Sequence, residues 1–145
     1  MAGLICAAVS SSIGTGSATT KTLLQITAPA NTGIRVTRVS VSFDGTSPTA
    51  GKAYCELVRG ATSGTGTSLT PVKLHGHTGS VQSTAKENFT SEPSGGSSAG
   101  LAELVHTQAG YTSPEDILLN PGETLSVRTN VPAAVNARVR MRWEE

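Results

Sequence analysis

Hydrophobic and polar residues alternate strictly near the C-terminal end of the sequence, between residues 137 and 143. The apolar positions are Ala137, Val139, Met141 and Trp143, and the positions between them are Arg138, Arg140 and Arg142. Successive side chains of a β-strand point to opposite faces of the sheet. The pattern therefore predicts a strand with one face in the core and one cationic face.

Residues 34–43 predict a second strand, with one irregularity. Ile34 and Val36 share one parity, whereas Val39, Val41 and Phe43 share the other. The phase of the alternation changes near residues 37–38, and an extra residue in a strand produces such a change. We therefore expect a β-bulge there, with a bend or a switch of the strand between two sheets.

Short stretches of similar character recur along the rest of the chain, separated by turns rich in Gly, Pro, Ser and Asn. They cover residues 22–27, 53–59, 69–74 (a short edge strand broken by Pro71), 86–91, 101–107, 117–119 and 125–128. Many short strands with regular turns and no amphipathic helix indicate an all-β fold, an antiparallel β-sandwich. The strand count and length favour a jelly-roll-like sandwich; an immunoglobulin-like topology is the alternative, without the Cys…Trp…Cys spacing of antibody domains.

Residues 1–19 have a different composition, small, rich in Ser and Gly and almost uncharged. This composition is typical of an arm or linker. The apolar patch near its start has no Lys or Arg before it, unlike a secretory signal, so we expect it to belong to the working protein. The sequence thus predicts an extended N-terminal arm at residues 1–19 and a β-sandwich domain at residues 20–145.

The overall charge balance is nearly neutral, and it narrows the class of partner. The 145 residues carry a formal net charge of +1, and only 14% of them are charged. No global field would draw such a chain to nucleic acid or to a membrane surface, so we expect neither as a partner. Aromatic residues make up 3% of the chain, which disfavours a sugar-stacking module. Cys6 and Cys55 lie in different settings and are expected to be free thiols.

Motifs that would carry catalysis or bind a cofactor are weak or incomplete. His75-Gly76-His77 could share a metal ion, but no carboxylate or cysteine lies nearby in sequence, so polar loop histidines are the favoured interpretation. No Gly-x-Ser-x-Gly elbow occurs, and the Gly-rich stretches at residues 14–16 and 64–68 do not continue as a Walker loop. The acidic pairs at residues 115–116 and 144–145 are adjacent, which places them on opposite faces of a strand. We predict no catalytic, cofactor-binding or metal-binding residues and no enzymatic activity.

The ladder of Arg138, Arg140 and Arg142 is the strongest charge feature of the sequence. Guanidinium groups suit bidentate contacts with carboxylates and phosphates. Three interpretations stay open: a solvated outer face, a surface that docks onto an acidic protein, and a nucleic-acid site, the last weakened by the lack of interleaved aromatic residues.

Three stretches resemble small structural proteins encoded by tailed bacteriophages. They are Val41–Ser47, Gly64–Leu74 and Met141–Glu145. The overall build is similar to that of capsid decoration (cement) proteins. This resemblance implies a small β-sandwich, often a homotrimer, that sits on the major capsid protein with the help of an extended arm.

The resemblance leads us to expect a virion structural protein on the capsid exterior that binds and stabilises the major capsid protein. Leu4, Ile5 and Val9 are the expected arm anchors, because burying such side chains contributes about 1.5–3 kcal/mol each. Deletion of residues 1–19 would then abolish particle binding and leave a folded domain. The alternative is a receptor- or glycan-binding head of a phage fibre or tail protein, with contacts through the loops at residues 60–68 and 92–100.

Overall fold

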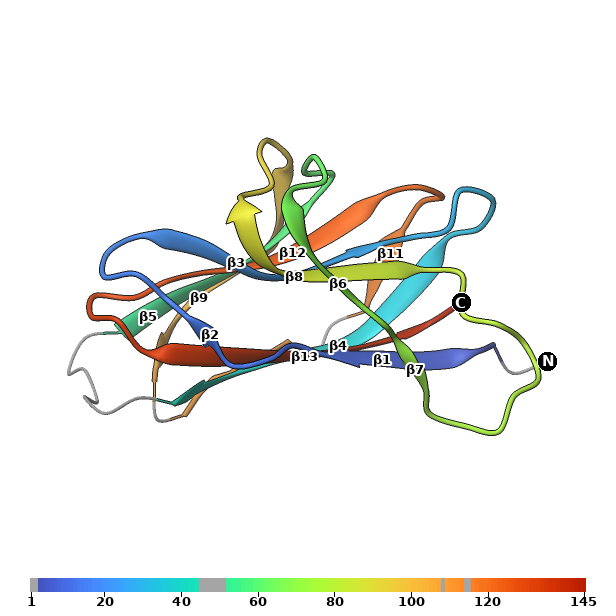
Figure 1. Cartoon of the computed structure of the whole chain (residues 1–145), viewed down its shortest axis with the longest axis horizontal. Coiled ribbons are helices and arrows are strands. Elements are labelled where there is room, and N and C mark those ends of the chain that lie inside the picture. Colours follow the sequence, from blue (N-terminus) through green and yellow to red (C-terminus); the bar gives the residue numbers. More distant parts are fainter. Residues whose placement is uncertain (1–2, 45–51, 108, 114–115) are drawn as a thin grey trace.

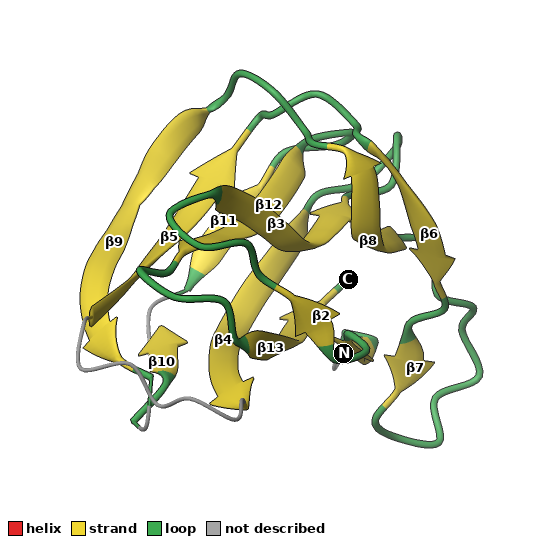
Figure 2. Ribbon diagram, turned by 60° about the vertical axis from the view of Figure 1, so that its left-hand side comes forward, coloured by secondary structure: helices red, strands yellow, loops and turns green. Residues whose placement is uncertain are grey.

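A computed structural model describes residues 3–44, 52–107, 109–113 and 116–145, and all regular structure in these ranges is β-strand. Residues 45–47 of the stretch Val41–Ser47, and Glu115 of the first acidic pair, lie outside the described residues. The strands form two layers, stacked face to face (Figures 1 and 2). This arrangement confirms the predicted antiparallel β-sandwich.

The first layer is a seven-stranded sheet and the second has six strands. The seven-stranded sheet runs in the order β10 (Tyr111–Ser113), β4 (Ile34–Asp44), β13 (Asn136–Glu144), β1 (Ile5–Val9) and β7 (Val72–Lys73), with β11 (Ile117–Leu119) beside β4 and β2 (Ile13–Gly14) beside β13. The six-stranded sheet runs in the order β6 (Thr65–Leu69), β8 (Thr84–Ser91), β3 (Thr20–Thr27), β12 (Thr124–Asn130), β5 (Lys52–Arg59) and β9 (Ser97–His106).

The strand pairs are nested along the chain. The outermost strands β1 and β13 pair with each other, and β3 pairs with β12. Inside these, β4 pairs with β10 and β11, and β5 pairs with β9. A long antiparallel ribbon wound over two sheets has this nested order, which is the jelly-roll arrangement. The prediction of a jelly-roll-like sandwich is therefore confirmed.

The N-terminal segment lies inside this winding, and the expectation of an extended arm is corrected. Strand β1 pairs with β13 on one side and with β7 on the other. Leu4 N donates to Glu145 O at 2.8 Å, and Leu4 itself is 6% exposed. The physical reason is that β13 would otherwise leave one row of backbone groups unpaired, and a short strand of small residues satisfies them. The linker-like composition of residues 1–19 is therefore a poor guide to their structure, because they contain a strand.

The predicted bulge in β4 is confirmed. Arg142 pairs with Arg38, but the next residue, Trp143, pairs with Val36, so Thr37 is the extra residue of β4. The strand remains beside β13 on both sides of the bulge and does not switch sheets. Ile34 and Val36 on one side of the bulge therefore face the same core as Val39 and Val41 on the other, although the two pairs differ in parity.

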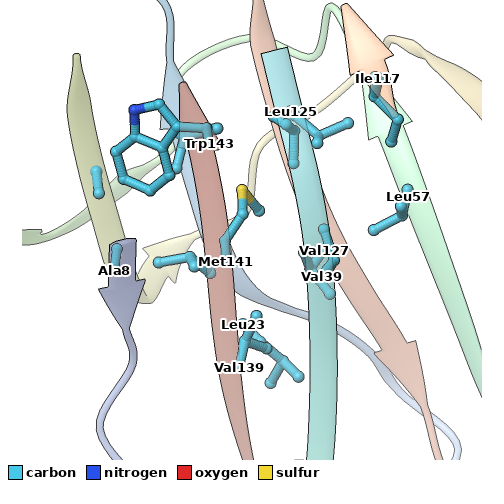
Figure 3. Close-up of a cluster of buried hydrophobic side chains, with 14 of the residues drawn as sticks. Ala8, Leu23, Val39, Leu57, Ile117, Leu125, Val127, Val139, Met141 and Trp143 are labelled. Carbon is cyan, nitrogen blue, oxygen red and sulfur yellow. The ribbon is translucent and has the colours of Figure 1, made fainter. Parts of the chain in front are cut away.

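The core between the sheets is built mainly from β4 and β13 of one sheet and from β3, β12 and β5 of the other. Val139, Met141 and Trp143 of β13 lie in one buried cluster with residues of the opposite sheet, among them Leu23, Leu125 and Val127 (Figure 3). Trp143 is fully buried, and its Nε1 donates to Ser83 Oγ at 2.9 Å. The predicted alternation of core and arginine positions between residues 137 and 143 is confirmed.

Several stretches differ from the predicted elements, among them the loop expected at residues 92–100, whose last four residues begin β9. The loop expected at residues 60–68 contains the start of β6, because its Thr residues pair with β8 despite the glycines among them. Pro71 separates β6 from β7, and these two short strands belong to different sheets. The predicted edge strand at residues 69–74 is thus divided between the two layers.

Candidate docking face

The predicted arginine ladder lies on the outer face of the seven-stranded sheet. Arg138, Arg140 and Arg142 are exposed, while the residues between them are buried. Strand β13 has β4 on one side and β1 on the other, so the ladder runs through the interior of the sheet face. The side chains that β4 and β1 place beside the ladder therefore determine the chemistry of this face.

Strand β4 adds a fourth arginine beside the ladder. Arg38 lies directly opposite Arg142, whereas Ser40 and Ser42 lie opposite Arg140 and Arg138. The bulge places Arg38 here, because the extra residue Thr37 shifts the alternation and turns Arg38 outward with the two serines. We call Arg38, Arg138, Arg140 and Arg142 the arginine face.

The arginine face has no neutralising partner among the described residues, where no carboxylate lies within 4.0 Å of any of its four guanidinium groups. Arg35, further along β4, contrasts with it. Arg35 Nη2 lies 2.7 Å from Glu144 Oε2, and Arg35 Nη1 lies 3.7 Å from Asp116 Oδ2. Hydrogen bonds from Arg35 and from the Gly3 backbone N–H lower the pKa of the Glu144 carboxyl. Arg35 is therefore compensated, and the arginine face is not.

Strands β1 and β7 add apolar side chains on the other side of the ladder. Val9 lies opposite Arg140, and Ile5 lies opposite Glu144. Val72 of β7 lies opposite Ala7 of β1. Val9 and Val72 are 45% and 54% exposed. We call the arginine face together with Ile5, Val9 and Val72 the docking face.

Two hollows lie on either side of the Arg38–Arg142 pair. The larger has a volume of about 290 Å³, and its lining includes Arg35, Thr37 and Ile5 as well as the pair. The smaller, of about 40 Å³, is lined by the same pair together with Ser40 and Arg140. Glu144, paired with Arg35, also lines the larger hollow, whereas no carboxylate lines the smaller one.

The sequence-predicted site residues meet here with one exception. Ile5, Val9 and the three ladder arginines share the docking face, whereas Leu4 points into the core and is unavailable as an anchor. Sequence reasoning missed Arg38 and Val72. The phase change at residues 37–38 indicates that Arg38 points outward. Its position beside the ladder follows only from the pairing of β4 with β13.

The two cysteines are free, as expected from the sequence, and the structure shows that both are buried. Desolvation raises the pKa of Cys6 and of Cys55 from 9.0 to about 11. Because the thiolate is the nucleophile, these thiols are poor nucleophiles near neutral pH.

The histidines and the terminal carboxylates serve local structure. His75 and His77 are exposed in the loop after β7, and the Nδ1 of His77 accepts a hydrogen bond from Gly79 N at 2.9 Å. Glu145 accepts hydrogen bonds from the backbone N–H groups of Gln82 and Ser83. Over the described part of the chain, no group of three His, Cys, Asp or Glu side chains could hold a metal ion.

The two loops of the alternative hypothesis, residues 60–68 and 92–100, lie side by side. Thr62 N donates to Ser94 O at 2.8 Å, and the Thr62 and Ser94 hydroxyls are 3.1 Å apart. Neither loop contains an aromatic residue. They form a joint polar rim without a stacking platform for sugars.

The comparisons with known proteins give only distant likenesses. No family model and no curated protein matches the sequence. Among solved structures, a mitogen from Yersinia pseudotuberculosis is 7% identical over 93% of this chain and 83% of its own, with a TM-score of 0.36. A chain of maize chlorotic mottle virus is 12% identical over 98% and 93%, with a TM-score of 0.30, and the capsid protein VP17 of bacteriophage P23-77 is 8% identical over 100% and 99%, with a TM-score of 0.24. At these TM-scores the likenesses carry no functional argument.

The described residues contain no helix that is long and apolar enough to cross a membrane.

Proposed function

We propose that this protein is a structural component of a virus particle, a decoration protein that binds a major capsid protein through the docking face. The observation that carries the proposal is the set of four arginines that have no carboxylate partner among the described residues and are bordered by exposed valines on the same sheet face. Such a face combines the residue types that are enriched in protein interfaces.

The arrangement of the arginine face is unfavourable for the isolated protein. Arg38 lies directly opposite Arg142, and like charges in this cross-strand position destabilise a sheet. Natural sequences break such local rules mainly at functional sites. An acidic partner surface would compensate the repulsion, which supports docking over a merely solvated face.

The sequence supplies the class of partner. The resemblance of Val41–Ser47, Gly64–Leu74 and Met141–Glu145 to small structural proteins of tailed bacteriophages favours a capsid surface, with the protein on the capsid exterior as a homotrimer. Binding by a sheet face replaces the arm mechanism, since residues 5–9 belong to the sheet. Repetition over many copies makes a modest affinity per subunit sufficient.

The test is sedimentation of the native protein from a lysate of its source in a density gradient. We expect it to travel with large particles at many copies per particle, and to be released as the salt concentration rises, because exposed charge pairs are screened by salt. Recovery solely as a small soluble species at low salt would refute the proposal.

A second candidate function is a receptor- or glycan-binding head, favoured by the side-by-side loops at Thr62 and Ser94. It predicts binding to a glycan array that is lost when these loops are altered and kept when the arginines are replaced. Particle binding that is lost when the arginines are replaced and kept when these loops are altered supports the decoration protein instead.

A further inference from the structure

We propose that the arginine face binds an extended acidic segment, with Asp or Glu at every second position, that lies along β13. This inference names the partner chemistry of the proposed function and rests on it. It follows from the spacing of the arginines, the hollows beside the Arg38–Arg142 pair and the apolar border.

The spacing of the ladder matches that of another strand. Arg138, Arg140 and Arg142 recur every second residue on one face of β13. Residues two apart in a strand are separated by about 6.5–7 Å, and the same repeat holds for any extended partner segment. Carboxylates at alternate positions of that segment therefore stay in register with the ladder.

The Arg38–Arg142 pair provides the strongest point of contact. The hollow of about 290 Å³ lies on the Glu144 side of the pair and the hollow of about 40 Å³ on the Arg140 side. The smaller hollow is lined by both arginines and by no carboxylate, whereas the larger one is also lined by Glu144, which is already paired with Arg35. A carboxylate of the segment in the smaller hollow would accept charge-assisted hydrogen bonds, which are stronger than neutral ones, and would reduce the repulsion between Arg38 and Arg142.

The surroundings favour a protein segment over a nucleic acid. Val9 and Val72 border the ladder and suit apolar side chains of a partner protein. The aromatic residues in the described strands of this sheet belong to its core side: Tyr111 and Trp143 are buried, and Phe43 is partly buried and packed against the core, so they are not placed to stack on bases. Single-stranded nucleic acids are generally held by stacking on exposed aromatic side chains as well as by charge.

The experiment titrates the isotopically labelled full chain with two synthetic peptides and follows the arginine Nε–Hε signals by NMR. One peptide carries Glu at every second position with Thr between, and the other carries the same number of Glu at every third position. The alternating peptide should bind about tenfold more tightly, the effect of one additional charge-assisted hydrogen bond, and should shift the Arg38, Arg140 and Arg142 signals. Equal affinities, or shifts confined to other arginines, would overturn the inference.

Charge-neutral variants locate the site. Arg38→Gln and Arg142→Gln should each weaken the alternating peptide about tenfold, whereas Lys52→Gln, which removes an exposed charge from the other sheet, should leave affinity unchanged. Arg38→Gln should also raise the melting temperature, because it removes a like charge opposite Arg142. Equal weakening by Lys52→Gln would mean attraction by charge alone and would contradict the proposed site.

A single-stranded oligonucleotide of matched charge completes the test. Tighter binding of the oligonucleotide than of the alternating peptide would overturn the choice of a protein partner. The proposed function fails separately: selective peptide binding without sedimentation on particles refutes the decoration role alone, and sedimentation without peptide selectivity refutes the acidic-strand inference alone.

Discussion

The indole of Trp143 shows how a single side chain depends on its polar partner. Trp143 is fully buried between the sheets, and its one N–H donates to Ser83 Oγ. The Ser83 backbone is in turn held by the Glu145 carboxylate. A buried donor without an acceptor costs far more than a hydrogen bond contributes on average. Ser83 therefore holds the loop before β8 against the end of the core.

Ser83→Ala should lower the free energy of unfolding by about 1–3 kcal/mol, the cost of an unsatisfied buried N–H group. Urea denaturation followed by tryptophan fluorescence measures this change, since Trp143 is the single tryptophan. Ser91→Ala, at an exposed serine at the end of β8, is the control and should change stability by less than about 0.5 kcal/mol. A Ser83→Ala protein as stable as the control would show that the bond is unimportant.

The two buried thiols predict a loss of stability at alkaline pH. The pKa of each is raised from 9.0 to about 11 in the folded protein, so between these values the unfolded chain has released protons that the folded chain retains. The free energy of unfolding therefore falls as pH rises through this window, and the thiol contribution is fully present below it. Urea unfolding on either side of the window should show a steeper fall for the native sequence than for the Cys6→Ala/Cys55→Ala variant. Identical slopes would contradict the assigned pKa values.

At the scale of elements, β1 combines two roles on its two faces. Cys6 and Ala8 point into the core, while Ile5 and Val9 lie on the docking face. The strand also occupies the edge of β13 that β4 leaves open. The N-terminal segment therefore contributes to the sheet and the core as well as to the proposed contact.

Substitutions at the adjacent residues Ala8 and Val9 test whether the two faces of β1 have these separate roles. Ala8→Asp should destabilise the fold by about 3–5 kcal/mol, because it places an uncompensated charge in the core. Val9→Asp places the same charge on the outer face and should change stability by less than about 0.5 kcal/mol while weakening particle binding. Thermal unfolding followed by circular dichroism compares them. If the two variants were equally stable, this result would contradict the assigned strand and support the free arm that the composition predicts.

The sequence predicted the elements whose two faces differ in polarity and missed those whose faces do not. Strand β13 was evident because arginine and apolar residues alternate, and the bulge in β4 was evident from a change in phase. In β1 the run Cys6-Ala7-Ala8 offers no such contrast, because all three residues are small and buried. Likewise, the Gly and Thr residues of β6 look like a loop. Pairing with a neighbour, rather than local preference, makes these segments strands.

At the scale of the whole molecule, the nested winding creates the docking face. It brings β4 and β1, which are distant from β13 in sequence, to the two sides of the arginine ladder. Neither the contact of Arg38 with the ladder nor the apolar border at Val72 could be predicted without the strand order. The net charge of +1 does not reveal this asymmetry: Arg35 and Arg59 are paired with carboxylates, whereas the arginine face has no such pair within the part of the chain that the structure describes.

The most direct test of the central claim, that the docking face binds the particle, is a rebinding measurement. Particles from a lysate of the source are stripped of the protein at high salt, and purified chains are returned at low salt before gradient sedimentation. We predict that the native chain and Lys52→Gln return to the particle fraction, whereas the folded Arg138→Gln/Arg140→Gln/Arg142→Gln variant stays at the top. Return of that triple variant in the same amount as the native chain would contradict the account.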